Sequence, residues 1–447
     1  MSEKPFAPDI AKRLVLETLT APVVFKGMIS DWPCMNWTIQ SLADVLGDQE
    51  VKFRIGPKEW SEHGVLWERD CCYRDATLHQ FSDWLANDTS NLPEDNPLKD
   101  FEISDSWCYA DYKYMAHIFQ DKTDVLKAVR WSDFGFHGRD GTESTLWIGS
   151  VGSHTPCHYD TYGCNLVAQI HGKKIWYMFP PIQTAMMYPT RIPYEESSVF
   201  SQVNVKNPDC RRFPKFRDCT PYNVTLEPGD VLFVPRHWWH YVECVTPAIS
   251  VNSWIELDID DNTRVEEAIT RTVTCSILSH VRDQDGTYSW LNPTEECTNT
   301  DTNLQYLQAA MKKLQAGSSS CDIKETNDNC KRETDGEPDR KKLRTFEEKP
   351  SPQEGSEQNL LRNEEIVLDE KNLKQNLFLK FVQCKSSFGN SNERGSEETG
   401  CQATDDGDHT AGIEFREPSN AMLVECLTHP SIINKVAELL KEKCSVK

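Results

Sequence analysis

The sequence has no apolar run long enough to cross a membrane, and its first residues carry charges and a proline where a signal peptide has an apolar core. We therefore expect a cytoplasmic protein without a membrane partner. The sequence also lacks paired CxxC motifs, although it has 17 cysteines, and this odd number does not suit a complete set of disulfides. These absences exclude zinc fingers and a disulfide-rich secreted fold, and they predict reduced thiols.

Basic and hydrophobic residues are both scarce. The chain has 48 lysines and arginines against 70 aspartates and glutamates, which gives a formal net charge of −22, and no basic stripe interrupts this acidity. We therefore do not expect a partner bound through nucleic-acid phosphate, whereas a basic or chaperone-like partner fits the charge. Because hydrophobic residues make up only 38% of the 447 residues and the mean hydropathy is −0.60, part of the chain is not expected to pack into a core.

Pattern and composition divide the chain into five parts. Residues 1–110 alternate strand-like and short helical patterns and form an N-terminal α/β flank. In residues 111–260 strand-like runs recur between Pro, Gly, Asn and Asp turns, which predicts a mainly β core, best described as a double-stranded β-helix of the jelly-roll or cupin type. Two helical patterns occupy 261–317, an acidic polar stretch that we expect to be disordered occupies 318–419, and amphipathic helices return in 420–447.

The segments after the core have two interpretations each. Apolar residues recur at intervals of four from Val265 to Val281, preceded by a capping-box pattern of Thr263 and Glu266. The helices in this region either fold back on the barrel or form a homodimer interface, and the C-terminal apolar stripe either packs back onto the barrel or docks a partner. The basic cluster at 340–344 is either a nuclear import signal, which would allow nuclear access, or a solvated tract.

Two histidines and one carboxylate carry the strongest chemical signal. His158 and Asp160 are two residues apart, so on a β-strand both side chains face one cavity while Tyr159 faces away. His154 has the same parity and is a candidate for the same face. His240, at the end of a Trp-Trp-His run, belongs to a later predicted strand. Together His158, Asp160 and His240 form the facial triad of a non-haem Fe(II) oxygenase, which leaves coordination positions open for a co-substrate and O2.

Nearby residues suit a second ligand. A dicarboxylate co-substrate such as 2-oxoglutarate chelates iron through its keto-acid end and needs a cation and a hydroxyl for its far carboxylate. Lys174 and Thr155 are suitable for this role. Asn252 and Trp254, on a later strand-like segment, would add to such a site, and Trp254 could both pack there and shield the co-substrate.

These residues carry a resemblance to a known family. Residues 147–181, with Pro-Gly-Asp at 228–230 and Trp-Trp-His at 238–240, resemble the JmjC family of 2-oxoglutarate oxygenases, and especially its hydroxylase branch. The resemblance implies Fe(II) on His158, Asp160 and His240, with 2-oxoglutarate and O2 as further ligands. The residues that it implies around 2-oxoglutarate are Lys174, Thr155, Asn165, Asn252 and Tyr109.

The resemblance extends beyond the core motifs over roughly the first two thirds of the chain. Its further stretches are 191–200, 234–243, 252–257, 264–271 and 291–295. It implies a small heat-shock protein of the 27-kDa type as a partner, and a role in the cellular stress response.

We therefore expect an Fe(II)/2-oxoglutarate-dependent dioxygenase that hydroxylates a protein side chain and converts 2-oxoglutarate to succinate and CO2. Histone demethylation is less favoured, because no zinc-ribbon chromatin reader accompanies the core. Residues 180–221, rich in Pro, Tyr and Arg, are interpreted as an insertion at the barrel mouth that builds the substrate groove. The alternative is a JmjC scaffold with little or no catalysis that binds and regulates a small heat-shock protein. Asparagine, histidine, lysine and RNA substrates all remain open.

Overall fold

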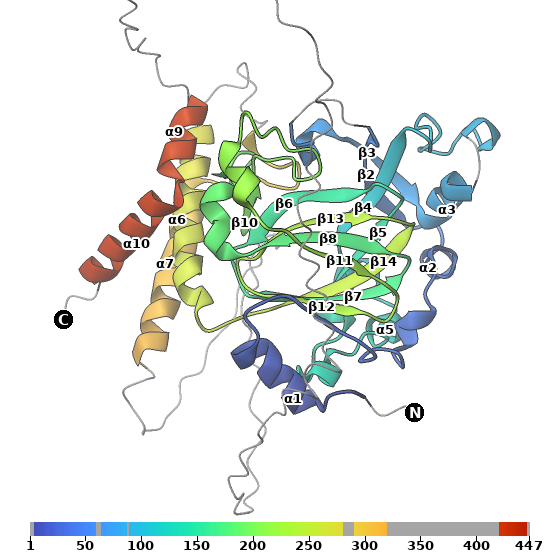
Figure 1. The fold of residues 1–447 in the computed structure, drawn as a ribbon, viewed down its shortest axis with the longest axis horizontal. Helices are drawn as coiled ribbons and strands as arrows, with labels where there is room; N and C mark the ends of the chain where they lie inside the picture. Colours follow the sequence, from blue (N-terminus) through green and yellow to red (C-terminus); the bar gives the residue numbers. More distant parts are fainter. Residues whose placement is uncertain (1–3, 60–63, 87–88, 280–289, 320–419, 445–447) are drawn as a thin grey trace, which may run out of the picture.

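The computed structural model describes residues 4–59, 64–86, 89–279, 290–319 and 420–444. The basic cluster at 340–344 and residues 320–419 of the expected disordered linker lie outside the described residues. Two sheets form a barrel, and a layer of helices lies along one side of it (Figure 1).

Within the described residues every pair of neighbouring strands is antiparallel, and the strands form an eight-stranded and a six-stranded sheet. The larger sheet has the spatial order β1 (Val23–Phe25), β12 (Val231–Val234), β7 (Cys164–His171), β14 (Ala248–Ile255), β5 (Thr145–Gly149), β4 (Ser106–Tyr114), β2 (Glu50–Pro57) and β3 (Cys72–Thr77). The smaller sheet has the order β11 (Tyr222–Leu226), β8 (Lys174–Phe179), β13 (Trp239–Cys244), β6 (His154–Asp160), β10 (Ser198–Ser201) and β9 (Pro189–Thr190). The chain crosses between the sheets from β5 through β8 and again from β11 through β14, so the predicted double-stranded β-helix is confirmed.

Helices lie in the N-terminal flank, between β4 and β5, and after the barrel. The α-helices of the described residues are α1 (Pro8–Arg13), α2 (Ile39–Leu46), α3 (Leu78–Ala86), α4 (Met115–Ile118), α5 (Thr123–Leu126), α6 (Asp260–Leu278), α7 (Thr300–Ser319), α9 (Asn420–Leu427) and α10 (Pro430–Cys444). A π-helical turn covers Leu14–Thr18, and short 3-10 helices cover Pro33–Asn36, Glu68–Asp70, Thr89–Asn91, Trp131–Phe134, Gly141–Glu143, Pro181–Met186 and Pro214–Asp218. None of the described helices is long and apolar enough to span a bilayer.

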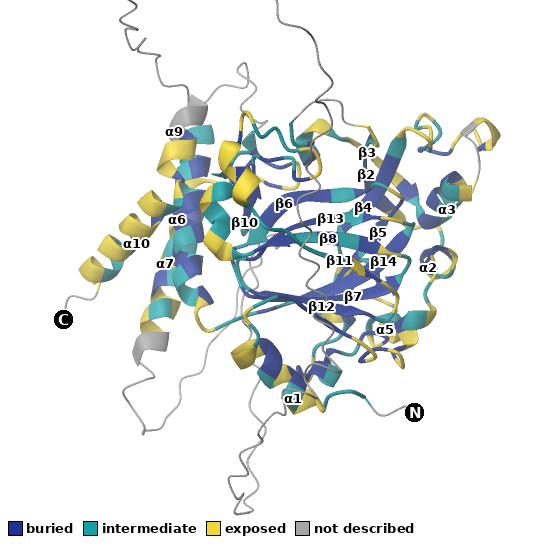
Figure 2. Cartoon of the chain, in the orientation of Figure 1, coloured by how far each residue is buried: buried dark blue, intermediate teal, exposed yellow. Residues whose placement is uncertain are grey.

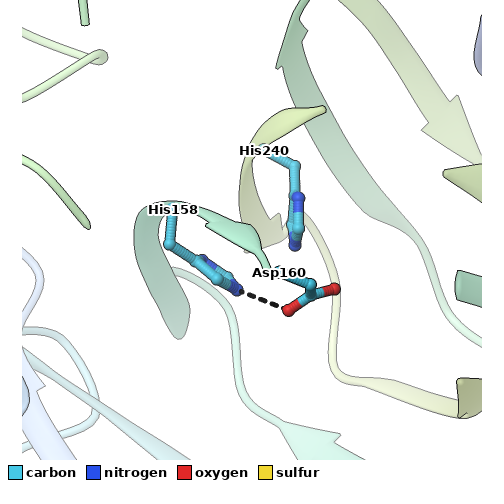
Figure 3. A group of neighbouring side chains, drawn as sticks. All are labelled: His158, Asp160 and His240. Carbon is cyan, nitrogen blue, oxygen red and sulfur yellow. Dashed lines mark ion pairs between the residues drawn. The ribbon is translucent and has the colours of Figure 1, made fainter. Parts of the chain in front are cut away.

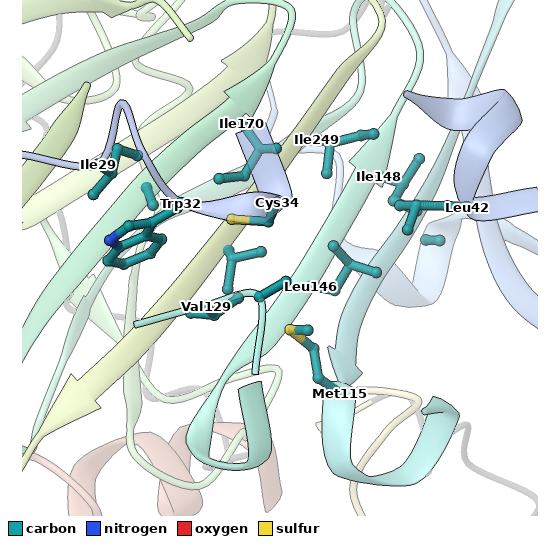
Figure 4. Close-up of a cluster of buried hydrophobic side chains, with 14 of the residues drawn as sticks. Ile29, Trp32, Cys34, Leu42, Met115, Val129, Leu146, Ile148, Ile170 and Ile249 are labelled. Atoms are coloured by element: carbon teal, nitrogen blue, oxygen red, sulfur yellow. The ribbon is translucent and has the colours of Figure 1, made fainter. Parts of the chain in front are cut away.

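The N-terminal flank shares the larger sheet with the barrel. Strand β4 runs across residue 110, where we had expected the flank to end, and β1 pairs with β12 at the opposite edge. The largest hydrophobic cluster lies between this sheet and the flank, with Ile148 and Ile249 from the strands against Trp32 and Leu42 from the flank (Figure 4). The larger sheet is therefore covered on its outer face, which agrees with the buried strands in Figure 2.

The insertion adds two strands to the barrel. Within residues 180–221, β9 and β10 extend the smaller sheet, and β10 pairs directly with β6 so that Ser198 lies opposite Asp160 and Phe200 opposite His158. The insertion therefore forms one wall of the barrel beside the predicted metal ligands.

The helices after the barrel pack on one another. The predicted capping box at Thr263 and Glu266 is wrong, because α6 begins at Asp260 and the Thr263 hydroxyl accepts a hydrogen bond from Arg236 instead. The inward faces of α6, α7 and α10 share one apolar cluster, whose buried members are Val265, Ile269, Met311, Ile433 and Ala437. The C-terminal stripe thus packs on α6 rather than on the barrel itself.

Candidate metal centre

The three residues of the predicted triad meet on two neighbouring strands. His158 on β6 lies directly opposite His240 on β13, and Asp160 follows two residues along β6. One ligand atom from each side chain lies within 4.8 Å of the other two, and the His158 Nε2 to Asp160 Oδ1 distance is 3.7 Å. Figure 3 shows the three side chains turned toward one point.

Backbone carbonyls fix which ring nitrogen each histidine offers. His158 Nδ1 lies 2.8 Å from the Pro156 carbonyl oxygen, and His240 Nδ1 lies 2.9 Å from that of Trp238. Since a carbonyl only accepts, both Nδ1 atoms carry hydrogen, and each Nε2 keeps its lone pair. Burial, with a smaller contribution from the neighbouring His158, lowers the pKa of His240 to about 4. Two imidazoles that each offer Nε2, together with a carboxylate, suit a divalent first-row metal, with further positions left for other ligands.

The second oxygen of the triad carboxylate is held from the opposite sheet. Trp254 Nε1 on β14 donates a hydrogen bond of 3.1 Å to Asp160 Oδ2. This bond leaves Oδ1, the oxygen nearer to His158, as the one directed at the centre of the triad. Trp254 therefore does more than pack and shield, because it orients a candidate ligand.

A glycine shapes the turn that follows Asp160. Gly163 has a φ of +60°, and a Cβ there would lie 2.3 Å from the Ile255 carbonyl oxygen. Its N–H donates to both carboxylate oxygens of Asp260, at 3.0 and 2.9 Å. Only glycine accommodates this close approach, so the turn and the first residue of α6 together fix the end of β6.

A buried cation occupies the deep end of the same pocket. Lys174 is 1% exposed, and its Nζ donates to Ser250 Oγ at 2.7 Å and to Tyr109 Oη at 3.3 Å. In the part of the chain that the structure describes, no carboxylate lies within 4.0 Å of this ammonium, and burial lowers its pKa. Such a charge is costly without an anionic partner. Its surroundings therefore fit the far carboxylate of a dicarboxylate ligand.

A second unsatisfied group lines this pocket. Trp176 Nε1 is buried and has no hydrogen-bond partner among the described residues. Buried donors are almost always paired in folded proteins, so an isolated one beside a cavity fits a site that receives a ligand with acceptor oxygens.

An irregularity in β6 brings Thr155 into the pocket. Thr155 lies three residues before His158, and simple alternation would place the two on opposite faces. The register between β6 and β13 shifts, so that His158 pairs with His240 and Thr155 with Val242, and both line the pocket. His154, a candidate for the inward face by its parity, does not line this pocket, because the shift turns it into a separate pocket on the outer face of the smaller sheet.

Asparagine side chains connect the two sides of the pocket. Trp147 Nε1 donates to Asn252 Oδ1 at 2.7 Å, and Asn252 Nδ2 donates to Asn165 Oδ1 at 2.9 Å. The pocket holds the triad and all six residues that we expected around the co-substrate, namely Thr155, Lys174, Asn165, Asn252, Tyr109 and Trp254. The structure thus brings all nine predicted site residues together.

Sequence reasoning missed several lining residues. Ser250 lies on β14 at the same parity as Asn252 and Trp254, so alternation along that strand was sufficient to find it. Tyr112 lies within a register shift of β4, between Ala110 and Lys113, and has a positive φ of 52°, which no local pattern in the sequence indicates. Trp147, Trp176, Val167 and Val242 complete the lining.

Comparison with known proteins agrees with this fold and pocket. A family model described as a cupin-like domain matches residues 14–261. The chain therefore belongs to the cupin-like domain family, and its domain is of the JmjC type, as the sequence motifs predicted.

Individual proteins also match this chain, at different levels of identity. HSPB1-associated protein 1 from Bos taurus is 52% identical over 310 residues, which are 69% of this chain and 63% of that protein. HSPB1-associated protein 1 homolog from Danio rerio is 52% identical over 314 residues, or 70% of this chain and 69% of that protein. Lysine-specific demethylase 8 from Xenopus tropicalis is 27% identical over 246 residues, or 52% of this chain and 47% of that protein. The chain thus matches somewhat less than two thirds of the cattle protein's length.

Proposed function

We propose that this chain is an Fe(II)/2-oxoglutarate-dependent dioxygenase that hydroxylates a protein side chain. The observation that carries the proposal is the pairing of a three-donor metal site with a buried ammonium that lacks an anion, in one pocket. A metal site alone would suit many functions. A metal site beside an unpaired buried lysine suits a dicarboxylate that binds both.

Each residue has a defined task in this proposal. His158, Asp160 and His240 hold the metal through two Nε2 atoms and Oδ1. Lys174, Thr155 and Tyr109 bind and orient the far carboxylate of 2-oxoglutarate. Fe(II) with 2-oxoglutarate supplies the oxidation, in which O2 is consumed, the keto acid becomes succinate and CO2, and one oxygen atom enters a substrate C–H bond. The buried lining of the pocket excludes water from this chemistry.

Turnover of 2-oxoglutarate tests the proposal. Purified protein with Fe(II) and ascorbate should release succinate, and the His158→Ala, Asp160→Ala double variant should not. Tyr159→Phe is the matched control, because Tyr159 stands between the two ligands but packs in the outer cluster of the smaller sheet. Equal succinate release by the double variant would contradict the proposal.

We favour hydroxylation of a protein side chain over demethylation. Demethylation is the competing reaction because lysine-specific demethylase 8 is a relative of this chain, at 27% identity. Mass spectrometry of modified substrate distinguishes the two reactions, since hydroxylation adds one oxygen and demethylation removes a methyl group.

We also propose a small heat-shock protein as the partner, as the names of the more similar relatives suggest. The outer face of the C-terminal helices supports a docking role, because Leu427, Ile432, Val436 and Leu439 are all exposed there. The alternative function, a scaffold with little or no catalysis, would use the same face.

Purified HSPB1 should bind the chain, and a variant with polar residues at Ile432, Val436 and Leu439 should lose this binding. Binding that is unchanged in this variant would exclude this face as the contact.

A further inference from the structure

The opening of the metal pocket is mostly aromatic. Of the residues that line the pocket, only Tyr112, Trp147, Asp160 and Trp254 are partly exposed, and all the others are buried. A substrate that approaches from solvent therefore meets three aromatic rings and the triad carboxylate before it meets any other lining residue. We call these four residues the entrance.

The hydrogen-bond donor of each aromatic ring at the entrance already has an acceptor within the protein. The Tyr112 hydroxyl donates to Glu195 Oε1 at 3.3 Å, Trp147 Nε1 donates to Asn252 Oδ1, and Trp254 Nε1 donates to Asp160 Oδ2. The rings therefore offer their faces and edges to a substrate, and they offer no free donor. Donation to a carboxylate also leaves the Tyr112 and Trp254 rings richer in electron density, which strengthens their attraction for a cation.

A buried negative charge lies behind Tyr112. Glu195 is 7% exposed, and its described partners are the hydroxyls of Tyr112 and Ser198 and the side-chain amide of Asn292, all of them neutral donors. No lysine, arginine or histidine nitrogen of the described residues lies within 4.0 Å of its carboxylate. A buried carboxylate without a cation is unfavourable unless a positive charge can approach it.

Neighbouring carboxylates do not share this situation. Glu267 on α6 pairs with Arg191, and Glu196 pairs with Arg271 at 3.0 Å. Among the described residues, Lys174 is the only lysine or arginine that lines the pocket, and it is itself buried and so not part of the entrance. With a divalent metal, Asp160, a dicarboxylate and Lys174 all present, the charges inside the pocket cancel. The charge of Glu195 then remains uncompensated beside the entrance.

We propose that the entrance selects a cationic side chain, an ammonium or guanidinium group, as the group presented to the metal. The inference rests on the proposed function and names its substrate class. A cation gains from the aromatic surface of the entrance and from the field of Glu195. A carboxylate finds no donor at the entrance and is repelled by the same field, and a neutral amide leaves its own polar groups unpaired against the rings.

Two small probes of the same shape test this selection. Methylguanidinium and N-methylurea differ in charge but hardly in size. Mn(II) in the triad, with 2-oxoglutarate present, broadens the NMR lines of any probe that comes close, and the Zn(II)-loaded protein gives the background. We expect the methylguanidinium lines to broaden roughly threefold or more beyond those of N-methylurea at equal concentration.

Glu195→Gln and Glu196→Gln form a matched pair of variants. Both remove one negative charge from neighbouring positions, but only Glu195 contacts Tyr112. The preference for the cation should fall in Glu195→Gln and persist in Glu196→Gln. Tyr112→Leu, which removes a ring and keeps the carboxylate, should also reduce it, and thermal unfolding checks that each variant is folded.

Two results would overturn the inference. One is equal broadening of both probes by the wild-type protein, and the other is a preference that survives in both Glu195→Gln and Tyr112→Leu. Failure of the proposed function gives a different result, because Mn(II) would then bind no more tightly to the wild type than to the His158→Ala, Asp160→Ala variant. The two failures are therefore distinguishable in one set of samples.

Discussion

At the scale of single residues, the triad depends on the groups that orient it. The two imidazoles are held by backbone carbonyls, which no side-chain substitution removes. The carboxylate of Asp160 is held by a side chain, the indole of Trp254. Among these three contacts, only the last one can be deleted without changing a ligand.

We predict that Trp254→Phe weakens metal binding about 10- to 100-fold, the usual effect of losing a group that orients a metal ligand. The phenyl ring keeps most of the packing but cannot donate to Asp160 Oδ2. Mn(II) titration followed by electron paramagnetic resonance measures the affinity. Trp84→Phe is the control, since Trp84 Nε1 donates to the Phe101 carbonyl, outside the pocket lining. Unchanged affinity in Trp254→Phe would show that the indole does not orient the ligand.

Buried Lys174 should lower the stability of the native state until an anion binds beside it. Burial lowers the pKa of Lys174 below its ordinary value of 10.5, so the unfolded chain binds this proton more tightly than the native protein. The stability of the native state therefore rises as pH increases through the lowered pKa, and this effect ends near 10.5. Below the lowered pKa the charged form is present, and its desolvation is unfavourable in full.

Lys174→Met should accordingly stabilise the metal-free protein by roughly 1–3 kcal/mol at neutral pH, with a gain that shrinks as pH rises. Denaturant unfolding at several pH values measures the free energy of unfolding. Lys173→Met is the matched control, because the side chain of Lys173 is 46% exposed and pairs with Glu227 on the surface. A gain that is independent of pH, or a loss of stability, would contradict this account of Lys174.

Strand alternation predicted one pair of the site residues from the sequence, and the chemistry and the family resemblance supplied most of the others. Alternation placed His158 with Asp160, and applied to β14 it also yields Ser250 beside Asn252 and Trp254. The same rule failed for Thr155 and His154, because the register shift opposite β13 reverses their faces. A bulge is set by the pairing of two strands, so the residues of one strand do not reveal it.

At the scale of elements, α6 holds the segment that carries Glu195. Arg191 at the start of this segment pairs with Glu267 on α6, and both side chains are almost fully buried. The backbone N–H of Ser197 also donates to Glu267. The helix therefore fixes one side of the entrance, although it contributes no residue to the pocket lining.

Breaking this pair should be costly. We predict that Glu267→Leu lowers the free energy of unfolding by about 3–5 kcal/mol, because it leaves the Arg191 guanidinium buried without an anion. Adding Arg191→Met should restore much of the loss. A double-mutant cycle by denaturant unfolding measures the coupling. Additive losses from the two substitutions would mean that the pair does not act as a unit.

At the scale of the whole molecule, the C-terminal helix α10 packs on α6, although the two helices are far apart in the sequence. Helix α10 buries Ile433 against α6 and exposes Ile432 on its other face, where the exposed fraction of the side chain is 46%. The sequence left packing and partner docking as alternatives. The two faces of α10 allow both at once.

These neighbouring isoleucines separate the two roles. Ile433→Ala should reduce the free energy of unfolding by about 2–4 kcal/mol, the usual effect of truncating a buried isoleucine. Ile432→Ala should change it by only about 0.5 kcal/mol, as expected for an exposed position. Hydrogen exchange of α6 and α10 provides the measurement. Equal effects of the two substitutions would mean that α10 does not pack on α6 in solution.

The sequence predicted the architecture of the core, but not the strand pairings that join distant segments. Recurrent short strands between turns, and a triad on two of them, indicated the double-stranded β-helix. That β1 and β4 join the flank to the barrel sheet depends on pairings between distant segments, such as Val23 with Phe233. No local pattern carries such pairings, so the sequence did not show that the flank shares a sheet with the barrel.

Binding of 2-oxoglutarate under anaerobic conditions tests most directly whether one pocket holds both ligands. Calorimetric titration into Mn(II)-loaded protein should give a Kd that weakens about 10-fold or more without metal, and likewise in Lys174→Met with metal present. Binding that is equally tight in Lys174→Met, or in the metal-free protein, would contradict the assignment of a shared metal and dicarboxylate site.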